Sequence, residues 1–119
     1  MAKEPEKSSR GLRDLCEALA LQYEQQDWGI VNASGRRLLE FISFYEAHPS
    51  LLATQKFELG ELVIASANEV LREGGTLDDR VMQFLLKNRR AFEAHIEYWR
   101  GLQDLSQFPV AGLLRQRTR

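Results

Sequence analysis

Apolar residues recur along most of this chain at intervals of three and four positions, which is the spacing of one face of an α-helix. Nowhere do apolar and polar residues alternate over a run rich in β-branched side chains, as they would in a strand. Leu, Ala, Glu, Gln and Arg dominate the segments between the breaks, and all of them favour helix. The pattern therefore predicts an all-α protein, an antiparallel bundle of four helices without a sheet.

Proline, glycine and capping residues divide this pattern into separate helices. Pro49 ends the second helix because proline disfavours helical geometry in the residue before it, and Gly74 offers the left-handed position that often follows a helix. Thr76 is a favourable N-cap for the last helix, and the two acids that follow match the positive end of its dipole. The four helices are predicted over about residues 10–26, 28–47, 51–73 and 76–107.

The last of these helices carries the most regular pattern in the chain. At 1.5 Å per residue it would extend for about 45 Å. Its apolar positions follow one another in steps of three and four, as in the seam of a coiled coil. The sequence leaves open whether this seam closes a bundle within one chain or a homodimer. The seam consists of Val81, Leu85, Asn88, Phe92, His95, Ile96, Trp99 and Leu102.

The chain has 119 residues, which amounts to a single domain, since domains cluster near about 100–150 residues. Residues 1–9 are polar and charged and predict a disordered N-terminal arm, and residues 10–108 form the predicted helical bundle. Residues 109–119 are predicted to be a flexible C-terminal tail, short and apolar at first and basic at its end. Such a tail either folds back on the bundle or meets a partner, because monomers rarely expose apolar segments.

The balance of charges narrows the classes of partner. Sixteen Lys and Arg against 17 Asp and Glu leave a net charge of −1, so the chain lacks the basic surface expected of a nucleic-acid-binding protein. No apolar run approaches the length of about 18 residues that a membrane span needs. The N-terminus carries no apolar signal segment, and the single cysteine, Cys16, cannot form an internal disulfide. These features predict a cytoplasmic protein that binds no nucleic acid and has no membrane span.

Residues that could carry catalysis or hold a metal do not form a motif. His48 and His95 have no Cys, His or carboxylate neighbours at the spacing of metal ligands. Cys16 lies on the apolar stripe of the first helix and is expected to be a buried small hydrophobe. The basic clusters at 36–37 and 87–90 are interpreted as solvated helix faces. We therefore predict that the protein is not an enzyme and uses no metal and no cofactor.

What remains is surface for binding, on the long helix and on the tail. Aromatic residues of the kind found there are enriched at the centres of protein interfaces, although packing within the bundle explains the same residues. We predict that one set of them forms a groove or part of the core, and that a second set belongs to a tail that competes for the groove. These candidates for partner binding are Phe92, Ile96, Trp99 and Leu102 in the groove or core, and Phe108, Leu113 and Leu114 in the tail.

Two stretches resemble a known family. Residues 19–31, LALQYEQQDWGIV, resemble the "LA…e-x-W-x-x-[LIV]" segment of the FliT-type flagellar export chaperones, in which a helix breaks just before a tryptophan. Residues 86–92, LKNRRAF, followed by WRGL from Trp99 and then by Leu105, are similar to the third helix of that family.

The resemblance implies a cytoplasmic, non-catalytic chaperone of type III export. Such a protein holds the amphipathic helix of a secreted flagellar axial protein, such as the filament cap, in an apolar groove and delivers it to the export apparatus. In the family a C-terminal segment covers the binding surface until a client displaces it, and residues 108–114 would correspond to that segment.

The chain departs from the family pattern in two places. Residues 50–75 predict a helix that shorter members lack, and the tail contains Pro109 and Gly112 where the family's tail is usually helical. The alternative is an immunity or antitoxin-type protein, which neutralises an effector by direct binding and is also small, helical and without motifs. A transcriptional regulator would need a basic recognition helix, whereas the helix after Gly75 begins with acidic residues.

Overall fold

The computed structural model describes the backbone of residues 3–24 and 26–118 and the side chains of residues 11–24 and 26–118. Within these residues the chain forms seven α-helices, one 3-10 helix and no strand, which confirms the predicted all-α class. No helix in this part of the chain is long and apolar enough to cross a membrane. The elements are α1 (Lys3–Leu19), α2 (Trp28–Val31), the 3-10 helix η1 (Gly35–Arg37), α3 (Leu38–Ala47), α4 (Ala53–Arg72), α5 (Asp79–Lys87), α6 (Glu93–Arg100) and α7 (Pro109–Arg117).

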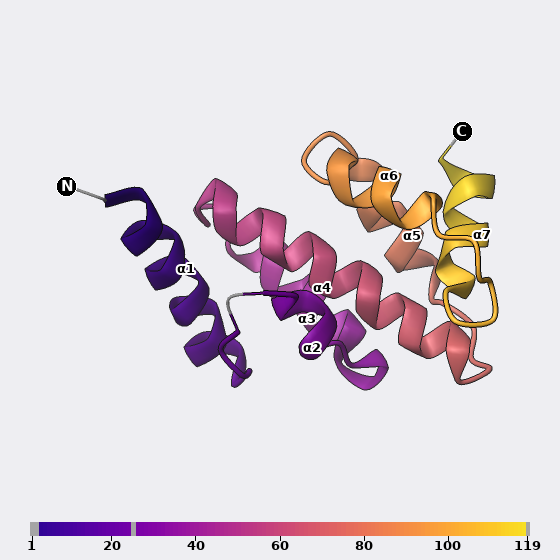
Figure 1. Ribbon diagram of the computed structural model, residues 1–119, viewed down its shortest axis with the longest axis horizontal. Helices are drawn as coiled ribbons and strands as arrows, with labels where there is room; N and C mark the ends of the chain where they lie inside the picture. The colour runs from indigo at the N-terminus through magenta and orange to yellow at the C-terminus, as the bar shows by residue number, and fades with distance from the viewer. Residues whose placement is uncertain (1–2, 25, 119) are drawn as a thin grey trace.

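Helix α4 forms the centre of the molecule (Figure 1). From Leu59 to Asn68 it is buried at every residue except Glu61, which is half-buried. A helix that is apolar on nearly all sides is stable only when other elements surround it, and here α1, α2, η1, α3, α6 and α7 all pack against it. The molecule measures 44 × 24 × 24 Å, with α1 at one end and α5, α6 and α7 gathered at the other (Figure 1).

Two glycines allow neighbouring segments to approach α4 closely. A Cβ atom added to Gly29 of α2 would lie 2.8 Å from the backbone nitrogen of Leu62. A Cβ atom added to Gly60 of α4 would lie 2.5 Å from the ring of Phe92. Any larger side chain at these positions would have to push the neighbouring segment away, so the two glycines set the distance of α2 and of Phe92 from the central helix.

The helix predicted over residues 28–47 is divided in the structure into α2, η1 and α3. Asn32 follows α2, and its Nδ2 donates to the carbonyl oxygens of Trp28 (3.0 Å) and Gln22 (2.9 Å). Beyond it, the backbone nitrogen of Ser34 donates to Oγ of Ser66 in α4 (3.0 Å). Side chains that bond nearby backbone in this way compete with the helix, so polar bonds interrupt it although the apolar spacing continues.

The prediction of one long helix over residues 76–107 is wrong, because α5 and α6 are separated by turns at residues 88–92. At the end of α5, Nδ2 of Asn88 donates to the carbonyl oxygen of Phe84 (2.9 Å). The turns bring Phe92 onto the surface of α4. The structure therefore shows no coiled-coil seam of this length, and its described helices are not arranged as the predicted bundle of four.

The helix predicted over residues 51–73 agrees closely with α4. Gly74 follows it with a φ of 84°, the left-handed position that the sequence predicted. The next helix, α5, has Asp78 as its N-cap in place of Thr76. Oδ1 of Asp78 accepts a hydrogen bond from the backbone nitrogen of Arg80 (2.9 Å), which satisfies one of the free donors of the first turn.

Helix α1 differs from the prediction at both ends. It begins at Lys3, inside the segment 1–9 for which the sequence predicted a disordered arm; residues 1–2 lie outside the described residues. It ends at Leu19 rather than near residue 26, because Ala20 adopts a left-handed conformation with a φ of 54°. The chain then runs without helix as far as α2 in the part that the structure describes.

Candidate functional site

The tail predicted to be flexible is instead a docked helix. The sequence predicts a flexible segment over residues 109–119, whereas the structure shows α7 as far as Arg117; residue 119 lies outside the described residues. Pro109 occupies the first turn, where its missing N–H is not needed. The apolar segment thus folds back on the protein, and α7 lies against α6 and α4. Its buried apolar residues are Val110, Ala111 and Leu114.

A buried asparagine of α4 connects α7 to the central helix. Asn68 is only 4% exposed, and it uses both ends of its carboxamide. Its Nδ2 donates to the carbonyl oxygen of Gln107 (3.0 Å), and its Oδ1 accepts from the backbone nitrogen of Val110 (3.1 Å). One side chain therefore fixes the position at which α7 begins.

Two arginines hold the far end of α7. Nε of Arg115 donates to the carbonyl oxygen of Arg100 (2.7 Å), and its Nη2 donates to that of Leu102. Arg100 is the last residue of α6 and Leu102 lies just beyond it, so Arg115 supplies a donor for carbonyls that the helix leaves free. Arg89 donates to the carbonyl oxygen of Thr118 (2.6 Å), just beyond α7. The helix is held mainly by hydrogen bonds to backbone oxygens and by its apolar face.

The residues predicted to bind a partner all belong to the apolar core or pack against it, and none of them is fully exposed. The ring of Trp99 meets that of Phe108 edge to face, with their centroids 6.0 Å apart. Phe92 packs against Gly60 of α4 and the rings of Tyr45 and Phe84, and all seven residues lie in the apolar core or against it. Those that are buried are Phe92, Ile96, Trp99 and Leu114, and those that are half-buried are Leu102, Phe108 and Leu113.

The α6 side of this contact contains two polar atoms that are not satisfied. Within the described structure, Nε1 of Trp99 and Nε of Arg100 are buried and have no hydrogen-bond partner. Buried donors are nearly always paired in native proteins, and leaving one unpaired costs about 1–3 kcal/mol. The contact between α6 and the rest of the protein is therefore less complete than the core around α4.

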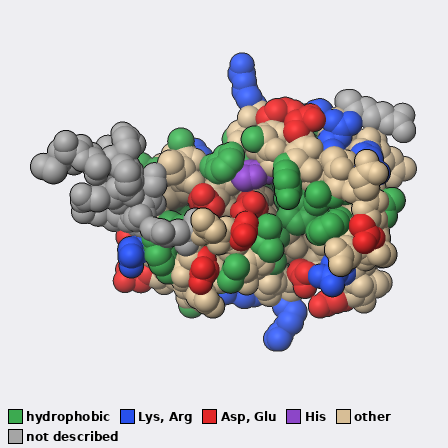
Figure 2. All heavy atoms as spheres, in the orientation of Figure 1, with side chains coloured by type: hydrophobic (Ala, Val, Ile, Leu, Met, Phe, Trp, Pro, Cys, Tyr) green, Lys and Arg blue, Asp and Glu red, His purple; other side chains and the backbone are tan. Residues whose placement is uncertain are grey.

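A buried histidine connects α6 to α4. Figure 2 shows one face of the molecule, on which apolar and acidic side chains surround a histidine. His95 is buried, and its ring lies tilted by 37° against that of Phe57 with a centroid distance of 4.0 Å. Its Nε2 lies 2.7 Å from the carbonyl oxygen of Phe57. Burial lowers the pKa of His95, and the bond to Phe57 and the charge of Glu61 oppose it only in part. Nearby on α4, burial and the charge of Glu61 raise the pKa of Glu58.

Cys16 and His95 both contribute to contacts between helices of the described structure. Cys16 is buried, as predicted, and its Sγ accepts a hydrogen bond from Nε1 of Trp28 (3.1 Å). Within the part of the chain that the structure describes, no group of three His, Cys, Asp or Glu side chains could hold a metal ion. Both residues act in packing: Cys16 joins α1 to α2, and His95 joins α6 to α4.

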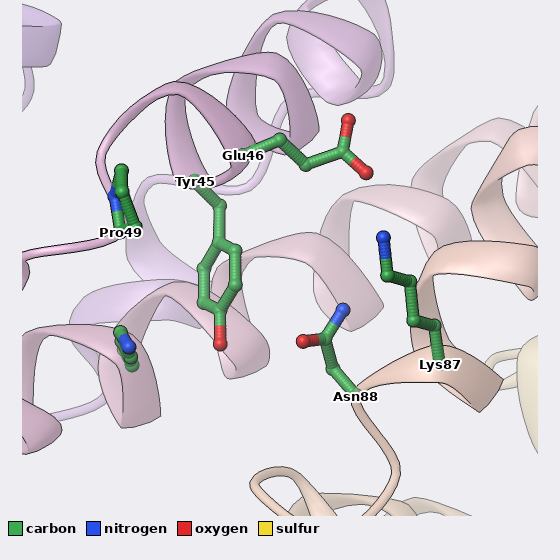
Figure 3. A pocket seen from close by; sticks show the side chains of 6 residues that line it. Tyr45, Glu46, Pro49, Lys87 and Asn88 are labelled. Carbon is green, nitrogen blue, oxygen red and sulfur yellow. The ribbon is translucent and has the colours of Figure 1, made fainter.

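A concave region lies on the α3 and α5 side of the molecule (Figure 3). It is a hollow of about 280 Å³, and a neighbouring hollow of about 210 Å³ shares Glu46 and Lys87 with it. In Figure 3 the side chains of Glu46 and Lys87 extend into the opening from two different helices, and the carboxamide of Asn88 points toward the hydroxyl of Tyr45. The larger hollow is lined by Tyr45, Glu46, Pro49, Lys56, Lys87 and Asn88.

Sequence reasoning missed two sets of residues at these sites. Asn68 follows residues 62–67, LVIASA, in which only Ser66 is polar. That position was the available signal, since a polar residue that is buried must find partners. Lys56 and Lys87 gave no such signal, because they are 31 positions apart and only the fold places them at one hollow. Lys87 was interpreted as part of a solvated face.

Comparison of the chain with family models, with curated proteins and with solved structures finds no match.

Proposed function

We propose that this protein is a non-catalytic cytoplasmic binding protein, in which the groove between α4 and α6 holds an amphipathic helix of a partner. The observation that carries the proposal is α7 itself, a nine-residue helix docked there by an apolar face and a few hydrogen bonds. Proteins commonly recognise partners by laying an amphipathic helix into an apolar groove. In the free protein, α7 occupies the place of that helix.

The energetics of α7 favour an exchange of this kind. A helix of nine residues is unstable in isolation, so its order depends on the contact with α4 and α6. A partner helix that accepts a hydrogen bond from the indole N–H of Trp99 would gain a bond that α7 does not make. The attachment of α7 to the same chain gives it an effective concentration of about millimolar, so only a partner of higher intrinsic affinity replaces it.

The class of partner in this proposal comes from the resemblance to the FliT-type chaperones. We propose a secreted flagellar axial protein such as the filament cap, held in the cytoplasm and passed to the export apparatus. The groove and its covering helix agree with this role. An effector neutralised by an immunity-type protein could use the same groove, and the experiment separates the two.

The test compares two substitutions on the same helix. Arg115→Ala removes the bonds to Arg100 and Leu102, whereas Arg117→Ala changes an exposed arginine that makes no hydrogen bond or ion pair within the described residues. Each tagged protein is used to capture partners from lysate of the native organism, and hydrogen exchange reports how often α7 opens. We expect Arg115→Ala to speed exchange in α7 and to enrich the partner about tenfold, since charged hydrogen bonds contribute about 1.5–3 kcal/mol.

The outcome separates the proposed functions. Capture of a flagellar axial protein, enriched by Arg115→Ala over the Arg117→Ala control, supports the export chaperone. Capture of a toxin-like effector with the same enrichment keeps the groove and replaces the class of partner. Faster exchange in α7 with equal or weaker capture of every partner contradicts the groove as the binding site.

A further inference from the structure

The hollow between α3, α4 and α5 combines positive charge with fixed polar groups. Lys56 comes from the first turn of α4, Lys87 from the last turn of α5, and Tyr45 from α3. The neighbouring hollow, which shares Lys87, adds Arg80. Against these three cations there is one carboxylate, that of Glu46.

The two lysines have no counter-ion of their own. Lys56 and Lys87 are two of only four lysines in the chain, and among the described residues neither lies within 4.0 Å of a carboxylate oxygen. Four arginines, by contrast, form ion pairs with acids three or four positions away in the sequence. Those arginines are Arg37, Arg72, Arg89 and Arg100. The charge around the hollow is therefore available to a bound anion.

The polar groups between the lysines are held in place. The ring of Tyr45 packs edge to face against Phe84 and Phe92, with centroid distances of 5.0 and 5.5 Å. Its hydroxyl makes no hydrogen bond within the described residues, and burial raises the pKa of Tyr45, so the hydroxyl stays a donor at neutral pH. Asn88 is oriented by the bond from its Nδ2 to the carbonyl oxygen of Phe84.

We propose that this hollow binds a small oxoanion, a phosphate or a carboxylate group, between the ammonium groups of Lys56 and Lys87, with the hydroxyl of Tyr45 as a further donor. Cationic side chains that bond oxoanions form the stronger class of hydrogen bonds. The hollow is lined by residues of α3, α4 and α5 and by Pro49 and Asn88 beside them, and none of these belongs to α7. It is therefore a second site, and it does not depend on the function proposed for the groove.

The experiment titrates the full chain with inorganic phosphate and, separately, with succinate, at constant ionic strength set with NaCl so that screening does not vary. Isothermal calorimetry and the NMR shifts of the residues around the hollow report binding. The first ligand represents free phosphate or phosphate esters, and the second represents carboxylates. We expect saturable binding of at least one of them, with shifts confined to the hollow.

Four variants test which side chains are responsible. Lys56→Gln and Lys87→Gln should each weaken binding about tenfold, the typical effect of one charged hydrogen bond. Glu46→Gln should strengthen it, because a nearby negative charge is removed. The control is Arg72→Gln, which changes the same charge about 24 Å farther along α4 and should leave binding unchanged. Thermal unfolding confirms that each variant folds.

Three results would overturn the proposal. The first is the absence of saturable binding of either ligand up to about 10 mM. The second is equal binding by wild type and by the folded double variant Lys56→Gln/Lys87→Gln. The third is a loss with Arg72→Gln as large as with the lysine variants, which would show a response to net charge rather than a site. Binding of phosphate alone, or of succinate alone, supports the proposal and identifies the source of the oxoanion.

Discussion

Helices α2 and α7 both pack against α4, but different contacts hold them there. On the side of α2, Gly29 brings backbone against backbone, and the indole N–H of Trp28 is paired with Cys16. On the side of α7, the helix is held by Asn68 and Arg115, and the indole N–H of Trp99 has no partner within the described structure. The elements that move for function come from the less stable parts of a protein. We therefore expect α2 to stay in place and α7 to open more readily.

We expect the largest effect from a substitution that overpacks the contact between α2 and α4. In Gly29→Ala the new Cβ atom would lie 2.8 Å from the backbone nitrogen of Leu62 and 2.9 Å from Cγ of Glu61, so α2 must shift. We expect the free energy of unfolding to fall by about 3 kcal/mol, measured by urea unfolding followed by circular dichroism.

The matched control is Gly101→Ala, where the nearest atom to a new Cβ is the carbonyl oxygen of Tyr98, at 3.5 Å. That variant should change stability by less than about 1 kcal/mol. Equal stability of the two variants would show that α2 is not tightly constrained, and the contrast between the two sides would then be lost.

The next effect concerns the connection of α7 to α4. Asn68→Ala leaves the carbonyl of Gln107 and the N–H of Val110 without their partner, which should cost about 2 kcal/mol. We expect hydrogen exchange to accelerate in α7 while α2 and the middle of α4 keep their protection.

The control for this variant is Glu69→Ala, at the next position of the same helix, which removes only an exposed ion pair with Arg72. An exposed pair of this kind contributes at most about 1 kcal/mol. If Asn68→Ala accelerates exchange equally in α2 and α7, the two sides open together and α7 is not a separate unit.

The same contrast explains what could be predicted from the sequence. The predicted bounds of α4 differ from the observed ones by two residues at the start and by one at the end. The prediction succeeded because the apolar pattern, the length and Gly74 all indicate the same helix. The divided helices were not predicted, because apolar spacing continues across the breaks at Asn32 and Asn88, and each break depends on a side chain that bonds nearby backbone.

The candidate site was predicted only in part. The apolar residues of α6 and α7 were named from their pattern, but which of them meet depends on how α7 docks. That docking depends on Asn68, which is 42 positions from Val110. The two lysines of the oxoanion hollow are likewise brought together only by the fold. Periodicity describes one face of one helix, whereas these contacts join residues that are distant in the sequence.

We expect a smaller effect from a substitution that stabilises α7. Gly112 lies within this helix, and a Cβ added there would meet only Leu105, at 3.8 Å, which is ordinary contact. Since alanine favours helix over glycine by about 1 kcal/mol, Gly112→Ala should slow hydrogen exchange in α7. If α7 competes with a partner, the same variant should weaken capture of that partner about fivefold. Slower exchange without weaker capture would separate α7 from binding.

The smallest effect we expect is a dependence on pH at the contact of α6 with α4. Burial lowers the pKa of His95 below its ordinary value of 6.5, so the folded protein binds a proton less readily than the unfolded chain does. Stability should therefore fall as the pH drops below about 6.5, with a slope of at most about 1.4 kcal/mol per pH unit, and should level off below the lowered pKa. Urea unfolding at pH 7.5, 6.5 and 5.5 (about one unit apart) measures this slope.

Two histidine variants test whether His95 is the titrating group. His95→Gln should remove this part of the slope, whereas His48→Gln, at an exposed position, should retain it. Because His95 holds α6, protonation should first accelerate hydrogen exchange in α6 and α7 and leave α2 protected. An equal slope in the His95→Gln variant would place the titrating group elsewhere in the protein.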